Sequence, residues 1–297
     1  MKKIVTLIIV VLLFGTAQAA VNVNAMYFTH SGTISYWGGA PTIAEAVKAP
    51  DDGWFVQLGR QSYIVLRFPD NYVAAPDGTS APDLQVDIYD ALFGAEAEVL
   101  VSLDGSNWTS VGVYADTANI DLDLEGVGMV KYVKVDQDDY DTGYPDDPDL
   151  GFDLDGVVAL NAVLLVDIDI KPGSWPNPIN LKSRGVVPVA LLTTDDFDAG
   201  TVDPTTVEFA GAAPVRWTLG NVDGDGDYDM LFHFRTQELN LNANSTEATL
   251  TGETEDGQRI SGTDKIRIVP PKKNQQVRTV QSKKKQQVRA APRKKKR

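Results

Sequence analysis

The chain has 297 residues, no cysteine, and 41 acidic against 27 basic residues, which gives a formal net charge of −14. The lack of cysteine excludes disulfides, thiolate metal sites and cysteine nucleophiles. Twelve basic residues lie in residues 271–297 and two more at positions 2 and 3, so the remainder carries 13 basic against 41 acidic residues, a formal charge of −28. Such a body disfavours specific binding to nucleic acid and attracts divalent cations.

The N-terminus has the pattern of a secretory signal peptide. Two lysines precede an apolar run from Ile4 to Phe14, and Ala17-Gln18-Ala19 forms a small-residue cleavage site. This run is short for a membrane-spanning helix, and no later apolar stretch approaches the roughly eighteen residues that such a helix needs. Residues 1–19 are therefore predicted to be a signal peptide, and the protein to be secreted to the extracellular space or the cell surface without a transmembrane segment.

Residues 20–165 are predicted to form one antiparallel β-sandwich. Short runs with period-two alternation or β-rich composition are separated by Gly, Pro, Asn and Asp. The expected strands are residues 62–68, 84–89, 97–102, 129–135 and 156–160, and one short helix is expected at residues 43–47. Repeated short strands with turns between them are typical of a sandwich or jelly roll.

One motif in this unit, Ser102-x-Asp104-Gly105-x-x-Trp108, carries a family resemblance. In it, Asp104-Gly105 makes a turn and Trp108 packs under that turn. Together with residues 56–68, 82–89, 131–135 and 151–157, it resembles the discoidin (F5/8 type C), galactose-binding-like jelly roll of prokaryotic surface proteins. The resemblance covers most of residues 50–160. It implies the fold but not the ligand, because members use variable loops to bind glycans, lipids or other proteins.

An acidic segment, residues 136–149, contains seven aspartates. A cation relieves the mutual repulsion of clustered carboxylates, so one interpretation is a second calcium site. The alternative is a solvated loop. The candidate ligands are Asp136, Asp138, Asp139 and Asp141.

Aromatic residues in apparent loops of the first unit are candidates for sugar binding. Exposed aromatic faces stack on sugar rings, although aromatic residues in a sandwich more often pack in the core or under loops. The candidates are Tyr140, Tyr144 and Trp37.

Residues 166–269 are predicted to form a second, immunoglobulin-like sandwich that directly abuts the first. The expected strands are residues 166–170, 185–192, 206–209, 230–234 and 247–251. Pro188 lies inside the second of these, which predicts an edge position or a bulge because proline cannot donate to the ladder. Residues 168–173, 177–182, 185–190, 205–209 and 250–254 resemble a module that recurs in secreted and cell-surface proteins of prokaryotes, commonly as an accessory domain.

The strongest chemical motif of the chain lies in this second unit. Residues 221–229 read Asn-Val-Asp-Gly-Asp-Gly-Asp-Tyr-Asp, with Gly226 where a tight calcium loop turns. Calcium prefers six to eight oxygen ligands. The predicted ligands are the side chains of Asn221, Asp223 and Asp225, the backbone carbonyl of Asp227, and the side chain of Asp229, directly or through water.

The residues after the motif exclude a complete EF-hand. The twelfth position is Phe232 rather than glutamate, and residues 230–234 alternate like a strand. The loop resembles those of dockerins and FG-GAP blades, but neither whole family fits. We therefore predict a structural Ca²⁺ loop that enters a β-strand; the alternative is a solvated acidic turn.

Residues 270–297 are strongly basic and almost without apolar side chains, so they are predicted to be disordered. Such a tail would contact anionic surface polymers or the acidic body, or would have no specific partner.

A non-enzymatic binding protein is the function that the sequence favours. The only histidines are His30 and His233, and no nucleophile, zinc-protease or phosphate-binding motif is present. The chain is predicted to be a secreted, calcium-stabilised surface protein that recognises glycan through its first sandwich. The alternatives are a structural or assembly component that binds a protein, and a polysaccharide hydrolase that uses the acidic loops.

Overall fold

The computed structural model describes residues 22–32, 34–36, 40, 42–48, 54–59, 61–90, 96–137, 152–160 and 162–270. Within these ranges the elements are β-strands, apart from α1 (Ile43–Ala46) and a 3-10 turn, η1 (Ala199–Thr201). The predicted all-β class and the predicted short helix are confirmed. None of the helices described is long and apolar enough to cross a membrane. The predicted signal peptide and all but the first residue of the predicted basic tail lie outside these ranges.

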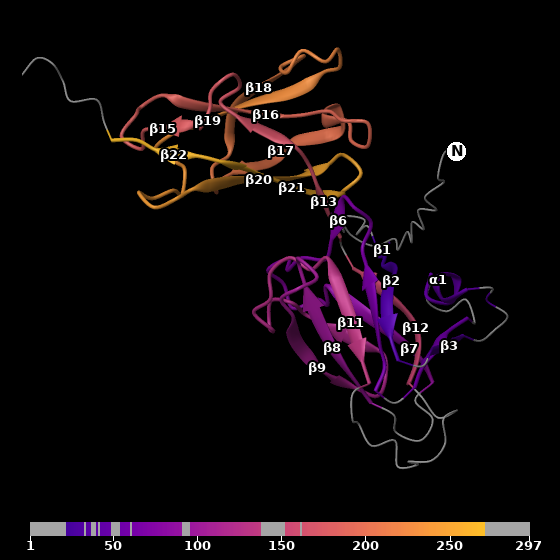
Figure 1. The fold of residues 1–297 in the computed structure, drawn as a ribbon. Coiled ribbons are helices and arrows are strands. Elements are labelled where there is room, and N and C mark those ends of the chain that lie inside the picture. Colours follow the sequence, from indigo (N-terminus) through magenta and orange to yellow (C-terminus); the bar gives the residue numbers. More distant parts are fainter. Residues whose placement is uncertain are drawn as a thin grey trace, which may run out of the picture.

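Two sheets enclose the first hydrophobic cluster and form the first sandwich, in the lower half of Figure 1. One sheet has the order β10 (Ala118–Ile120), β7 (Leu84–Asp90), β12 (Phe152–Ala159), β4 (Val56–Leu58), β3 (Ile34–Tyr36), and β1 (Val23–Asn24) also pairs with β12. The other has the order β2 (Met26–Ser31), β5 (Tyr63–Arg67), β11 (Tyr132–Asp136), β8 (Ala97–Ser102), β9 (Thr109–Tyr114).

Period-two alternation in the sequence positions this core. In β11, Val133 and Val135 are fully buried. Successive side chains of a strand point to opposite faces of the sheet. Tyr132 and Lys134 therefore lie on the outer face of the same sheet, half-buried rather than in the core.

Two further sheets enclose a second hydrophobic cluster in the upper half of Figure 1. One has the order β14 (Ile168–Ile170), β16 (Val186–Leu191), β19 (Asp229–Arg235), β18 (Pro214–Gly220). The other has the order β17 (Val202–Phe209), β20 (Glu247–Thr254), β21 (Arg259–Lys265), β13 (Val163–Leu165), β6 (Tyr72–Val73). A small parallel pair, β15 (Pro178–Ile179) with β22 (Arg267–Ile268), completes the strands of the described residues.

The prediction of an edge strand or a bulge at Pro188 is wrong, although the residue itself lies at a local edge of its sheet. Its strand, β16, lies between β14 and β19. The β14 ladder ends at the pair Ile170–Val189, and the next contact is the Lys171 amide donating to the Pro188 carbonyl oxygen at 2.8 Å. The N–H and C=O of one strand residue point to the same neighbour. The N–H that proline lacks would therefore face the side where the neighbouring strand has already ended.

The two groups of strands are joined by a sheet to which both contribute strands, rather than by a flexible linker. β13 pairs in parallel with β21 and antiparallel with β6, which belongs by sequence to the first unit (Figure 1). Arg259 of β21 donates from Nη2 to the Pro76 carbonyl oxygen at 3.0 Å, and Gln258 donates from Nε2 to the Ala162 carbonyl oxygen at 2.8 Å. Backbone and side-chain hydrogen bonds therefore join the two groups directly.

Candidate functional site

The predicted calcium loop connects β18 to β19, and the pair Gly220–Asp229 closes its base. The Asn221 Oδ1 accepts from the Gly224 amide at 2.6 Å, and the Asp223 Oδ1 accepts from the Asp225 amide at 3.2 Å. Gly226 has a φ of +119°, a conformation that favours glycine. The loop therefore turns at the glycine from which the tight turn was predicted.

Asp229 anchors the loop to the sandwich. This residue is fully buried, and its Oδ1 accepts from the Thr193 amide at 3.0 Å while its Oδ2 accepts from the Val222 amide at 2.7 Å. One carboxylate thus satisfies backbone donors on both sides of it. Asp229 sets the position of the loop whether or not it also contacts a cation.

Asp227 is the loop residue whose surroundings most directly indicate a cation. Its Oδ1 is buried without a hydrogen-bond partner. Burial raises the pKa of this carboxyl, and the nearby side chains of Asp225, Asp229 and Asp223 raise it further. A buried carboxylate oxygen among like charges is costly unless a cation or a proton compensates it. The loop residues therefore fit a divalent cation.

The loop does not bring three carboxylates as close together as another cluster does. Across the described ranges, three acidic side chains with ligand oxygens within 4.8 Å of one another occur at Asp83, Asp121 and Asp123. The ligand set predicted for the loop includes an amide oxygen and a backbone carbonyl, so it does not depend on carboxylates alone.

Most residues of the predicted second calcium site and sugar platform lie outside the described residues. These are Asp138, Asp139, Asp141, Tyr140, Tyr144 and Trp37. Asp136 is described: it ends β11, and its Oδ2 forms an ion pair with the Lys134 ammonium group. This aspartate therefore already has a cationic partner within its own strand.

The outer face of the first sandwich carries an aromatic groove that the sequence reasoning missed. It has a volume of about 190 Å³ and is lined by Phe28, Thr29, Tyr63, Val65, Gly105, Trp108, Tyr132 and Lys134. Phe28 is 51% exposed and meets Tyr132 edge to face, with 5.4 Å between the ring centroids. The Lys134 ammonium lies 4.4 Å from the centroid of the Tyr63 ring. We call this site the aromatic groove.

The turn at Ser102–Asp104 positions one wall of the aromatic groove. The Asp104 Oδ1 accepts from the amides of Ser106 and Asn107 at 2.7 and 2.8 Å. These hydrogen bonds hold the pKa of Asp104 well below its usual range. Gly105 has a φ of +73°, and a Cβ built there would lie 3.5 Å from the Tyr132 ring. The tight turn thus lets the backbone approach Tyr132 just before Trp108.

Comparisons with known proteins add little to this geometry. No family model matches the chain, and no curated protein matches it. Among solved structures, the adhesin domain of Epf from Streptococcus pyogenes is 8% identical, with 87% of this chain and 95% of that chain covered and a TM-score of 0.20. A likeness at that TM-score carries no argument about this chain.

Proposed function

We propose that this chain is an exported, non-catalytic binding protein that holds a neutral glycan in the aromatic groove of its first sandwich. The observation that carries the proposal is the set of four aromatic rings, from three strands and one turn, around a single groove. Aromatic faces offer large, rigid contact area to the C–H faces of sugar rings, and groups at the rim fix orientation by hydrogen bonds. Thr29 and Lys134 are the polar side chains among the lining residues apart from the aromatic ones, whose tyrosine hydroxyl and indole N–H groups also form hydrogen bonds.

The charge of the groove and of the chain favours a neutral glycan over an anionic one. Lys134 is paired with Asp136, and Arg67, which lies over the Phe28 ring, is paired with Asp70. Both cations at the groove are thus compensated. The chain as a whole has a formal charge of −14, which repels anionic polymers at long range.

The test is a panel of neutral gluco-, galacto- and manno-oligosaccharides presented to the full chain. We expect binding to at least one class, and a loss of tenfold or more in affinity, about 1.4 kcal/mol, for Phe28→Ala and Trp108→Ala. Trp217→Ala is the matched control, because Trp217 is a 44% exposed tryptophan on β18, outside the groove. No binding to any neutral glycan, or equal losses in all three variants, would refute the proposal. Turnover of a bound oligosaccharide would instead support a hydrolase.

The second part of the proposal is that the loop at residues 221–229 binds Ca²⁺ as a structural ion. The buried Asp227 oxygen without a hydrogen-bond partner supports it. In the proposed site, Asn221, Asp223 and Asp225 supply side-chain oxygens, Asp227 supplies a further oxygen, and Asp229 holds the base of the loop. The ion itself would supply the positive charge that offsets the clustered carboxylates.

This part is tested by thermal unfolding of the full chain in calcium and in chelator. Extracellular modules often bind calcium with dissociation constants of roughly 10⁻⁴–10⁻³ M. At ten times the dissociation constant, binding stabilises the folded state by about 1.4 kcal/mol. We expect Asp225→Asn to reduce this shift, and Asp195→Asn, an exposed acid of the same unit, to leave it unchanged. Identical shifts in the two variants would argue against a loop site.

A second candidate function, contact with a partner protein, is favoured by one specific surface. β18 is an edge strand of its sheet, and its apolar side chains are exposed by 43% at Val215, 44% at Trp217 and 59% at Leu219. Exposed apolar edge strands are sites for strand addition by another chain. If this surface dominates, Trp217→Ala will abolish recovery of a partner or self-association in sedimentation, and Phe28→Ala will not.

A further inference from the structure

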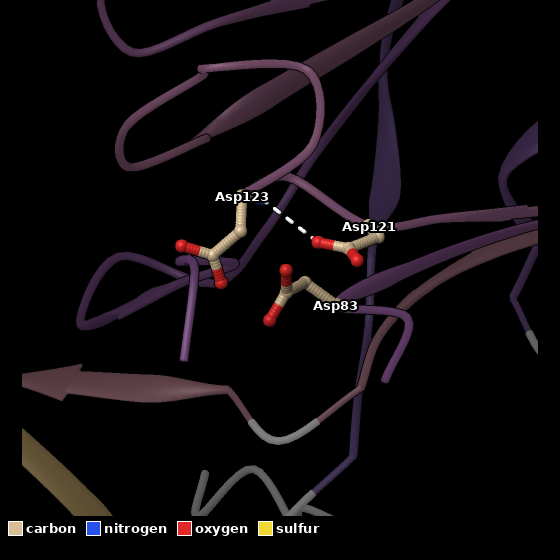
Figure 2. A group of neighbouring side chains, drawn as sticks. All are labelled: Asp83, Asp121 and Asp123. Atoms are coloured by element: carbon tan, nitrogen blue, oxygen red, sulfur yellow. Dashed lines mark hydrogen bonds between the residues drawn. The ribbon is translucent and has the colours of Figure 1, made fainter. Parts of the chain in front are cut away.

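Three aspartates of the first sandwich converge because of strand register. β7 and β10 are antiparallel, with Ile120 opposite Leu84. Asp83 precedes β7 and Asp121 follows β10, so the two lie across from each other just beyond the end of the ladder. Asp123 enters from the turn that follows, and Figure 2 shows the three carboxyl groups pointing toward one another.

Backbone amides hold one oxygen of each carboxylate. The Asp83 Oδ2 accepts from the Leu122 amide at 2.9 Å, and the Asp121 Oδ1 accepts from the Asp123 amide at 3.0 Å. The Asp123 Oδ2 accepts from the Gly78 amide at 2.7 Å. Each side chain is therefore fixed in orientation, and each keeps its second oxygen.

The second oxygens of the two inner carboxylates are buried without a partner. Asp83 is only 1% exposed, and its Oδ1 has no hydrogen-bond partner; the same holds for the buried Oδ2 of Asp121. No ion pair within the described residues reaches these three side chains. A buried, fixed and unpaired carboxylate oxygen beside two other carboxylates is costly unless a cation or a proton compensates it, and a cation compensates all three groups at once.

We propose that Asp83, Asp121 and Asp123 form a Ca²⁺ site in the first sandwich. It is independent of the loop at residues 221–229 and distinct from the site predicted at residues 136–149. The ligand oxygens all lie within 4.8 Å of one another. Two oxygens on opposite sides of a Ca²⁺ ion, each about 2.3–2.6 Å from it, are about 4.6–5.2 Å apart. The three oxygens thus fit one coordination sphere as they stand, and water completes it on the exposed side of Asp123.

The site also bears on the junction between the two groups of strands. Asp123 is hydrogen-bonded to Gly78, two residues after Pro76, whose carbonyl oxygen accepts from Arg259 of β21. An ion bound by Asp123 therefore fixes the segment on which Arg259 docks. Calcium at this site is expected to slow amide exchange at Gly78 as well as at Leu122.

The experiment is calcium titration of the full chain by calorimetry, in an Asp225→Asn background that weakens the loop at residues 221–229. We expect this background to bind Ca²⁺, and the added change Asp123→Asn or Asp121→Asn to lower the stoichiometry by one ion. In both variants, the asparagine side chain keeps an oxygen that accepts the hydrogen bond from the backbone amide. Because they remove repulsion, they should also raise the melting temperature in chelator while losing part of the calcium-dependent rise.

Asp116→Asn is the matched control, an exposed acid of the same sandwich, and it should change neither quantity. If the Asp225→Asn background binds no Ca²⁺, or if its stoichiometry is unchanged by both added substitutions, the site at Asp83 does not exist. Failure of the loop proposal looks different, because the natural chain and Asp225→Asn would then bind the same number of ions.

Discussion

Replacing Asp229 should destabilise the second sandwich more than replacing any other acid of the loop. Its two carboxylate oxygens accept from the Thr193 and Val222 amides at 3.0 and 2.7 Å, and the residue is fully buried. Hydrogen bonds to a charged group contribute about 1.5–3 kcal/mol each, and an unpaired buried amide costs about 1–3 kcal/mol. Asp229→Ala is therefore expected to cost about 3–5 kcal/mol in chelator, and more in calcium because the displaced loop also loses the stabilisation that a bound ion gives.

The chemically closest variant, Asp229→Asn, separates hydrogen bonding from shape. The amide keeps one acceptor oxygen but turns an N–H group toward the second backbone donor, so its cost should lie at about half that of alanine. Urea denaturation gives the free energy, and amide exchange at Thr193 and Val222 reports the local opening. An Asp229→Asn variant as stable as the natural chain, or an alanine variant that costs under about 1 kcal/mol, would refute this account of the loop base.

Three further predictions concern the turn, the core and the packing of the connecting segment. Hydrogen bonds depress the pKa of Asp104. The contribution of the Asp104 carboxylate to the stability of the fold is therefore present above the unfolded pKa of about 4, and it is lost as the pH falls through the pKa of the folded state. The stability difference between the natural chain and Asp104→Asn should shrink in urea denaturation from pH 7 to pH 2. Phe209 is fully buried, with its ring centroid 5.2 Å from that of Phe234. Phe209→Ala should therefore lower the free energy of unfolding, measured by urea denaturation, by about 3–5 kcal/mol. A loss of less than about 1 kcal/mol would contradict the packing. A Cβ at Gly262 would lie 2.7 Å from the Val166 carbonyl oxygen, so Gly262→Ala should cost about 1–3 kcal/mol, and an unchanged melting temperature would show that this contact is not close.

Local patterns were enough to predict the class of fold and part of the strands, but they missed others such as β2, β9 and β21. Alternating valines predicted β11, and the glycine at position 226 predicted the turn of the acidic loop. These features depend on neighbours along the chain. The edge strand β18 was missed although Val215-Arg216-Trp217-Thr218-Leu219 alternates apolar and polar residues, a sequence signal that could have indicated it.

Features that depend on register between distant strands could not be predicted. The aromatic groove joins Phe28, Tyr63 and Tyr132, and only the order β2, β5, β11 makes them neighbours. Asp83 and Asp121 meet because Leu84 pairs with Ile120. Tyr63 and Tyr132 alternate with the buried residues of their strands and therefore point outward. This alternation is a sequence signal that could have indicated the groove.

The most direct test of the central proposal is the response of the tryptophan indole N–H signals to a neutral oligosaccharide. The chain has five tryptophans, so each signal can be assigned by single substitution. Titration with the gluco-, galacto- and manno-oligosaccharides should shift the Trp108 signal and leave that of Trp217 in place, and Phe28→Ala should abolish the shift. A Trp108 signal unmoved by every neutral oligosaccharide, or a shift confined to Trp217, would contradict glycan binding in the aromatic groove.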